Sequence, residues 1–434
     1  MNRKSILATL FLGLSVTSST MAGDDFENPP ISYYETVSND PVSLLWKQMQ
    51  SGQVKCEPDE RGEYLGALLK ALDVPISSQI LVFSKTSLQI SHISPRTPRA
   101  IYFSDTVYVG FVQGSNIMEL TAVDPQLGCV FYTFEVPGNG TDKDSPDRPT
   151  VIRDRGQCLS CHATTRTERV PGVLVRSIYS DKAGRPRSGA SSFVTDHRSP
   201  FLQRWGGWYV TGEHGSMRHL GNTFAVDRLD PQLVDAEEGA NWPKMPSAID
   251  TKPYLRDTSD IVALMVMEHQ TRVQNLITRA NYETRQAVYL DQAMNKALDR
   301  EPSHVSDSTK RRIASVGDEL IRGLLFADEF ALTNPVDGSS PYRDQFSTRG
   351  PFDSKGRSLY QLDLKQRLFR HGCSYLILSS QFDGLPEPVM QYVRAQMSSI
   401  LSNSQSIPSG VALDDAQREN LQQMLRELKP GWLL

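Results

Sequence analysis

Residues 99–136 read RAIYFSDTVYVGFVQGSNIMELTAVDPQLGCVFYTFEV, and short runs of β-branched and aromatic residues recur along this stretch. The runs AIYFSD, VYVGFV, IMELTAV and CVFYTFEV are separated by turn residues, a pattern typical of consecutive antiparallel strands. Two similar runs precede them, ILVFSK at 80–85 and SLQIS at 87–91. We therefore expect an antiparallel sheet built from residues 79–136.

Helical patterns lie on both sides of this predicted sheet. SLLWKQMQ and EYLGALLKALDV precede it, and after residue 257 apolar residues recur at helical spacing over 258–299. Further helices are predicted near 308–327, 357–371, 386–402 and 414–428. Between the two regions, VLVRSIY, SSFVTD and WYVTG predict short strands in an otherwise irregular stretch. Strands first and helices later predict an α+β fold, with an antiparallel β-rich N-terminal half and a mostly helical C-terminal part.

The first 22 residues, MNRKSILATLFLGLSVTSSTMA, have the layout of a secretory signal peptide: a basic start, an apolar core and small residues before Gly23. The apolar core is shorter than the roughly 20 residues that span a bilayer, and no later stretch is long and apolar enough. We therefore expect a chain exported to the bacterial periplasm, with no integral membrane span after signal cleavage.

Composition restricts the possible partners. The net charge of −4 over 434 residues argues against nucleic acid as a partner. Contents of 39% hydrophobic and 22% charged residues are typical of a globular protein with a large core. The sequence does not determine the oligomeric state.

Residues 156–162 read GQCLSCH and contain the motif C-x-x-C-H, which is the attachment signature of c-type haem. Two thiols at this spacing can add to the two vinyl groups on one edge of a porphyrin. The next residue then places an imidazole under the ring, where its Nε2 can bind iron. The motif predicts one covalently attached haem c, with thioethers to Cys158 and Cys161 and with His162 as the proximal iron ligand.

Other uses of the motif make demands that the sequence does not meet. A zinc knuckle needs a second tight pair of ligands, whereas the other cysteines, Cys56, Cys129 and Cys373, are isolated. A thioredoxin-like dithiol would begin a sustained helix after a strand, and no such pattern follows the motif. A disulfide within the motif would leave its histidine unexplained. Disulfide pairing among the three isolated cysteines is left open.

The second axial ligand of the iron has candidates in the stretch 193–222, FVTDHRSPFLQRWGGWYVTGEHGSMRHLGN. It contains His197, His214, Met217 and His219, and each of them also has an ordinary structural interpretation as a loop or core residue. The adjacent Arg218 is an alternative partner for a haem propionate. These histidines would also permit a separate metal site, completed by Asp196 or Glu213.

A second group of candidates lies in MVMEHQ, at the start of the predicted helix 258–299. Met265 and His269 are four residues apart and share one helix face, so either could face the iron. Methionine on an apolar helix face is more often a packing residue, which is the alternative interpretation here.

Four stretches together resemble a group of exported bacterial proteins with a single cytochrome-c-type haem motif. They are ILVFSKTSLQ, SPRTPRAIYF, the C-L-S-C-H run, and TDHRSPFLQRWGGWYVTGEHG with the following RHLGN, and the likeness covers residues 60 to 290. The resemblance implies covalent haem and export, but no substrate. Cys158, Cys161 and His162 match its motif directly. Bacterial di-haem peroxidases have two C-x-x-C-H motifs, whereas this chain has one.

These observations predict an exported mono-haem c-type protein that binds haem and transfers electrons in the periplasm to a redox partner protein. One alternative is a haem-dependent oxidoreductase or gas sensor with an open distal site, and another is a binding scaffold with structural haem. The expected segments are a signal peptide at 1–22, a lead-in at 23–40, a β-rich domain at 41–145, a haem-bearing segment at 146–256 and a helical region at 257–434.

Overall fold

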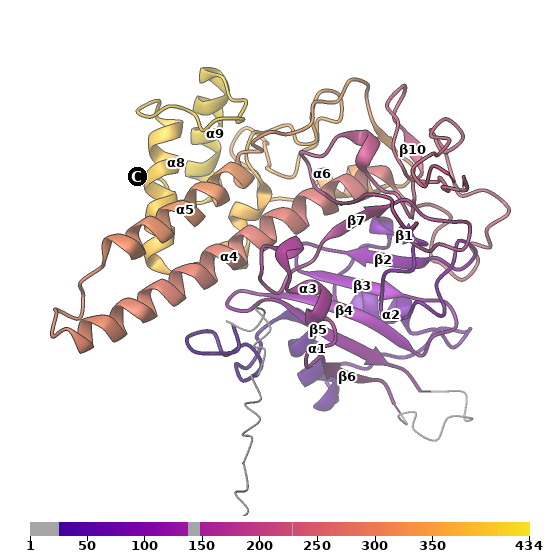
Figure 1. The fold of residues 1–434 in the computed structure, drawn as a ribbon, viewed down its shortest axis with the longest axis horizontal. Coiled ribbons are helices and arrows are strands. Elements are labelled where there is room, and N and C mark those ends of the chain that lie inside the picture. Colours follow the sequence, from indigo (N-terminus) through magenta and orange to yellow (C-terminus); the bar gives the residue numbers. More distant parts are fainter. Residues whose placement is uncertain (1–25, 138–147, 228) are drawn as a thin grey trace, which may run out of the picture.

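The computed structural model of the chain describes residues 26–137, 148–227 and 229–434. The predicted signal peptide at 1–22 and the first three residues of the lead-in lie outside this part of the chain. Within it, strands occupy mainly the N-terminal half and long helices the C-terminal half, which confirms the predicted α+β fold (Figure 1).

The central element is a seven-stranded antiparallel sheet in the order β6-β5-β4-β3-β2-β1-β9. Its strands are β1 (Ile80–Val82), β2 (Arg99–Phe103), β3 (Val107–Phe111), β4 (Ile117–Asp124), β5 (Gly128–Glu135), β6 (Thr150–Arg153) and β9 (Trp208–Tyr209). The hairpin of β4 and β5 pairs Leu120 with Tyr132 and closes at Gly128, whose φ is +68°. A Cβ at Gly128 would lie 2.4 Å from Thr278, so glycine is required there for close packing as well as for the turn.

Two predicted elements are absent. Residues 87–91 (SLQIS) form turns, and Leu88 and Ile90 are 57% and 50% exposed, so their alternation of apolar and polar residues does not reflect a buried strand face. Residues 357–371 are irregular where a helix was predicted. Leu364 has a φ of +59°, and the Asp363 carboxylate accepts hydrogen bonds from the backbone of the following residues, which replaces a helix by a turn.

Helices cover both faces of the sheet. On one face, Tyr132 donates to Asp40, the N-cap of α1 (Pro41–Gln50), at 2.5 Å, and α2 (Leu65–Ala71) follows. On the opposite face, Tyr108 donates to Gln274 of α4 (Ile261–Ala297) at 2.7 Å. The sheet is therefore enclosed between the N-terminal helices and α4.

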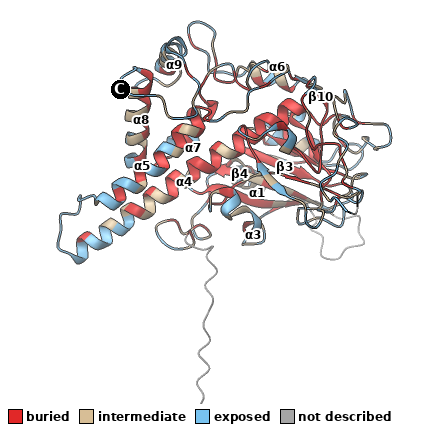
Figure 2. Cartoon of the chain, turned by 45° about the horizontal axis from the view of Figure 1, so that its top comes forward, coloured by how far each residue is buried: buried red, intermediate tan, exposed pale blue. Residues whose placement is uncertain are grey.

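The 37-residue helix α4 organises the C-terminal half. Its N-cap, Asp260, accepts hydrogen bonds from Val262 N and Ala263 N. The N-terminal half of α4 is buried against the sheet, whereas its far end projects with α5 (Asp307–Leu324) as a more exposed helical hairpin (Figure 2). Further along the chain, α8 (Glu387–Leu401) packs on α5, and α9 (Asp415–Leu428) packs on α8.

The shorter elements connect these layers. They are α3 (Leu159–His162), β7 (Val175–Ile178), β8 (Ser192–Thr195), β10 (Gly212–Glu213), β11 (Asp337–Gly338), α6 (Tyr342–Ser347) and α7 (Ser380–Asp383). β6 and β9 lie in the predicted haem-bearing segment, 146–256, but they pair with the strands of the predicted β-rich domain, 41–145. One cluster of buried residues includes members of both segments. The predicted boundaries at 145 and 256 stay a prediction. In the part of the chain that the structure describes, no helix is both apolar enough and long enough for a membrane crossing.

Candidate functional site

The C-x-x-C-H motif follows β6 through a tight turn and forms the short helix α3. Asp154 closes this turn, because its carboxylate accepts hydrogen bonds from Gly156 N at 2.9 Å and from Cys158 N at 3.1 Å. Gly156 has a φ of +129°, a conformation that favours glycine. The sequence DRGQC before the motif therefore has a local structural reason: it directs the chain out of the sheet and into α3.

The two motif cysteines are free thiols in the structure. Cys158 is half-buried and Cys161 is exposed. Burial, with the nearby Asp154 carboxylate, raises the pKa of Cys158 to about 12, so this residue is a neutral thiol near pH 7. The remaining cysteines, Cys56, Cys129 and Cys373, are also free thiols and are buried. Both motif sulfurs are thus available for thioether formation.

His162 is held by a reciprocal pair of hydrogen bonds to Gly172. Gly172 N donates to His162 O at 2.8 Å, and His162 Nδ1 lies 2.9 Å from Gly172 O. Since a carbonyl oxygen only accepts, Nδ1 is the protonated nitrogen, and Nε2 of the neutral ring is left with its lone pair. Nε2 makes no hydrogen bond to any residue that the structure describes. This arrangement is the one that a histidine needs in order to bind a metal through Nε2.

Helix α4 holds the loop that carries Gly172. The Asn275 side chain accepts from Val173 N at 3.2 Å and donates to Val173 O at 2.8 Å. A Cβ at Gly172 would lie 2.2 Å from Asn275 Oδ1, so only glycine permits this approach. The orientation of the His162 ring is therefore tied, through Gly172, to the main helix of the protein.

The sheet forms the other side of the site. The ring of Phe131, on β5, lies 5.0 Å from the His162 ring between centroids. An ion pair of 2.5 Å joins Arg99 on β2 to Glu119 on β4, and both charges act on His162. Burial lowers the pKa of His162, with Arg99 acting in the same direction, whereas the bond to Gly172 and the charge of Glu119 oppose it. The neutral imidazole is therefore the favoured form.

Both ring nitrogens of His214, a predicted distal ligand, are engaged. Nδ1 lies 2.7 Å from Met217 O, and Nε2 accepts a hydrogen bond from Asn241 N at 3.0 Å. Met217 is itself buried. Arg218, the predicted alternative partner for a propionate, donates to Glu237 at 2.7 Å. In this arrangement both ring nitrogens of His214 are bonded to backbone atoms of the 214–241 segment.

His219 is buried beside His214, with ring centroids 4.7 Å apart, and also contacts Trp205. Neither of its ring nitrogens has a hydrogen-bond partner within the described ranges, and burial lowers its pKa to about 3. Met265 is 2% exposed in the buried half of α4. The ring of His162 contacts Phe131 and Gly172, and its described contacts include none of the six predicted distal candidates.

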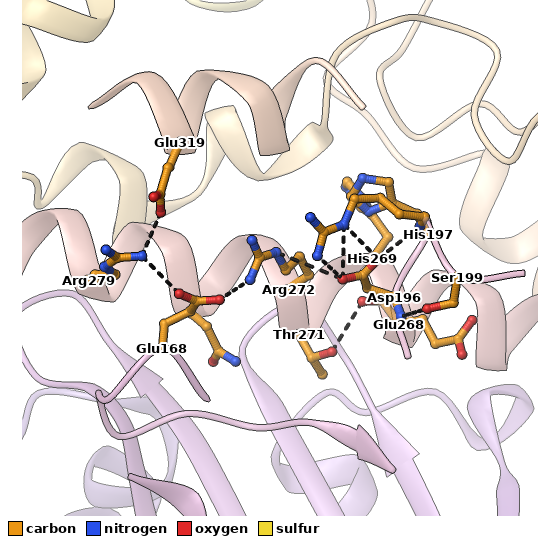
Figure 3. A network of polar contacts seen from close by, with 12 residues as sticks. Glu168, Asp196, His197, Ser199, Glu268, His269, Thr271, Arg272, Arg279 and Glu319 are labelled. Carbon is orange, nitrogen blue, oxygen red and sulfur yellow. Dashed lines mark hydrogen bonds and ion pairs between the residues drawn. The ribbon is translucent and has the colours of Figure 1, made fainter. Parts of the chain in front are cut away.

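His197 and His269, two further distal candidates, belong to a polar network along α4 (Figure 3). His269 Nδ1 lies 3.2 Å from His197 Nδ1, and His269 Nε2 lies 2.8 Å from Ser374 Oγ. In the same network, Glu168 bridges Arg272 and Arg279, and Arg279 also pairs with Glu319 of α5. The structure thus joins His197 and His269, which the sequence treated as members of separate groups.

Two residues that fix the orientation of the His162 ring, Gly172 and Asn275, were not predicted from the sequence. Gly172 lies in the VPG triplet after the motif, and this turn signal was the only local indication of its role. Asn275 had no signal in the sequence, because it lies among other polar residues of the helix, such as Arg272 and Arg279. A buried ion pair of 2.9 Å between Arg204 and Glu268 was also missed.

The described residues contain no group of three or more His, Cys, Asp and Glu side chains that could hold a metal ion, so they do not form the separate metal site that the sequence permitted. Comparisons of the chain with protein-family models, with curated proteins and with solved structures find no match.

Proposed function

We propose that the chain is an exported mono-haem c-type protein that transfers electrons in the periplasm to a redox partner protein. In this proposal Cys158 and Cys161 hold one haem c through thioethers, and His162 is the proximal iron ligand. The single observation that carries it is the bond from His162 Nδ1 to Gly172 O, which leaves Nε2 as the acceptor that iron requires. The haem iron would supply a one-electron couple.

The residues around His162 have positioning roles in this proposal. Gly172 O fixes the tautomer and the ring orientation of His162, and Asn275 fixes the loop that carries Gly172. A hydrogen bond from the remote nitrogen to a carbonyl also increases the basicity of a ligating imidazole. The low pKa of His162 keeps its ring neutral, which is the form that binds iron.

The distal side favours one alternative function. His214 and His269 have both ring nitrogens engaged, so neither offers an atom to iron in this arrangement. The other four candidates, His197, Met217, His219 and Met265, are all buried. The engagement of both ring nitrogens in His214 and in His269 supports a second candidate function. In this alternative the chain is a haem-dependent oxidoreductase or gas-sensing protein whose distal site is open.

The experiment is expression of the full chain in a bacterial host that matures c-type cytochromes. We expect the purified protein to carry the mass of one haem and to give a pyridine haemochrome spectrum of the thioether type. Cys158→Ala and Cys161→Ala should each lose one thioether bond, whereas Cys56→Ala, at a buried cysteine outside the motif, should keep both. A purified chain whose mass equals that of the polypeptide alone would refute the proposal.

A ferrous absorption spectrum with and without carbon monoxide separates the two candidate functions. A six-coordinate, low-spin iron that does not bind carbon monoxide supports electron transfer with a protein ligand on the distal side. Its coordination should then change in His219→Ala or in Met265→Ala. A high-spin iron that binds carbon monoxide in the unmodified protein supports the open distal site.

A further inference from the structure

A pocket of about 300 Å³ lies between α4, α5 and the loops around residues 168 and 197. Four guanidinium groups line it, those of Arg198, Arg272, Arg279 and Arg322. The carboxylates in its wall number three, those of Glu168, Glu319 and Asp328. Asp196 also pairs with Arg198, at 2.7 Å, so each of the four guanidinium groups has a carboxylate partner. A guanidinium carries five N–H donors; Arg198 uses only Nε and Nη2 toward its carboxylate partner, Asp196.

His197 is the buried polar group of this wall. The residue is 3% exposed, and its Nε2 has no hydrogen-bond partner among the residues that the structure describes. Leaving a buried polar group unpaired is energetically unfavourable, so such a group in a pocket wall indicates a ligand that pairs with it.

The hydrogen bonds behind His197 indicate which kind of partner is missing. Ser374 Oγ accepts from Leu376 N, and among the described residues His269 Nε2, 2.8 Å away, is the one acceptor that its buried hydroxyl proton can reach, so we assign Ser374 as the donor. His269 then carries its proton on Nδ1 and donates it to His197 Nδ1, at 3.2 Å. This order of donors places the proton of His197 on Nε2. The unpaired atom is then a donor, and its partner must be an acceptor.

We propose that this pocket binds a small oxyanion, a phosphate or a carboxylate, with His197 Nε2–H as its buried donor and Arg198 as a charged donor at its rim. The unpaired Nε2 of His197 and the unused Nη1 of Arg198 favour an acceptor that carries negative charge and disfavour a cation. The lining of this pocket does not include Cys158, Cys161 or His162, and it shares one residue, Glu168, with the loop between His162 and Gly172.

The test is isothermal titration calorimetry of the full chain with inorganic phosphate and, separately, with acetate. We expect saturable one-site binding of at least one of them. Arg198→Gln and His197→Phe should each remove one charge-assisted hydrogen bond to the anion. We therefore expect each variant to bind it at least about tenfold more weakly. The matched control is Arg312→Gln, which removes an α5–α4 ion pair of 2.5 Å to Glu283 outside this pocket and should leave the affinity unchanged.

Tighter binding of phosphate identifies a phosphoryl ligand, and binding of acetate alone identifies a carboxylate. Should His197→Phe fail to fold, ¹⁵N NMR of the histidines in the unmodified protein gives a second readout, a shift of the His197 Nε2 resonance on saturation. The proposal is overturned if neither anion binds saturably, or if Arg198→Gln binds with unchanged affinity.

Discussion

His162 and Gly172 exchange two hydrogen bonds, one from Gly172 N to His162 O and one between His162 Nδ1 and Gly172 O. Ten residues separate them in the chain, and the loop between them is anchored to α4 by Asn275 at one end and by Glu168 in its middle. The imidazole therefore moves only if the loop moves. Its orientation depends on contacts that lie far from the motif in sequence.

Replacement of Asn275 should loosen this loop. Asn275→Ala removes two hydrogen bonds and leaves the half-buried N–H and C=O of Val173 unpaired, so we expect a loss of about 1–3 kcal/mol in the free energy of unfolding. The loss should be accompanied by a changed ferrous haem spectrum or midpoint potential. The matched control is Asn281→Ala, a buried asparagine on the same helix that contacts Gly384 instead. An equal spectral change in both variants would contradict the positioning role of Asn275.

A side chain at Gly172 should be poorly tolerated for a steric reason. The Cβ in Gly172→Ala would lie 2.2 Å from Asn275 Oδ1, so one of the two must move, at a cost of about 1–3 kcal/mol. The double variant Gly172→Ala/Asn275→Ala should lose less stability than the sum of the single variants, because the second change removes the clash. Urea denaturation of the four proteins measures this coupling. Strict additivity would show that the clash is relieved elsewhere.

Glu268 should make the protein less stable as the pH rises from 5 to 8. Burial raises the pKa of Glu268 from 4.5 to about 7 despite its ion pair with Arg204, so the folded state holds this proton more tightly than the unfolded state. The associated stability is complete below the unfolded pKa and is lost as the pH passes the folded pKa, a change of about 2 kcal/mol. Glu268→Gln should reduce this slope in denaturation curves, whereas the exposed Glu387→Gln should not. Equal slopes in all three proteins would exclude Glu268 as the source.

His219 should have the opposite dependence. Burial lowers the pKa of His219 from 6.5 to about 3, so only the unfolded state takes up a proton between these values. Stability is then lost as the pH falls from 7 to 5, by about 2 kcal/mol for this residue. His219→Phe also removes two unpaired buried nitrogens. We expect its unfolding free energy to be less sensitive to acid than that of the unmodified protein, as measured by denaturation at pH 7 and pH 5. An unchanged difference between the two pH values would refute this.

Local sequence patterns correctly predicted the strands and helices in which apolar residues recur at a regular spacing. The strands from β2 to β5 and the helices α4, α5, α8 and α9 lie where the periodicity of apolar residues placed them. The strand predicted at 87–91 and the helix predicted at 357–371 are absent, because turn-forming hydrogen bonds of Ser87 and Asp363 prevail over weak apolar patterns in these segments. Of the candidate distal ligands, the sequence identified buried residues but not their partners.

The sequence by itself determined the α+β class and the C-x-x-C-H motif, because side-chain periodicity and adjacent residues are local properties of a chain. Only the tertiary structure decided which atoms face one another. The partner of Val173 lies 102 residues away on α4, and the contacts that connect His197, His269 and Ser374 span 72 and 105 residues. Buried polar atoms are paired by their positions in space, and no spacing along the chain encodes those positions.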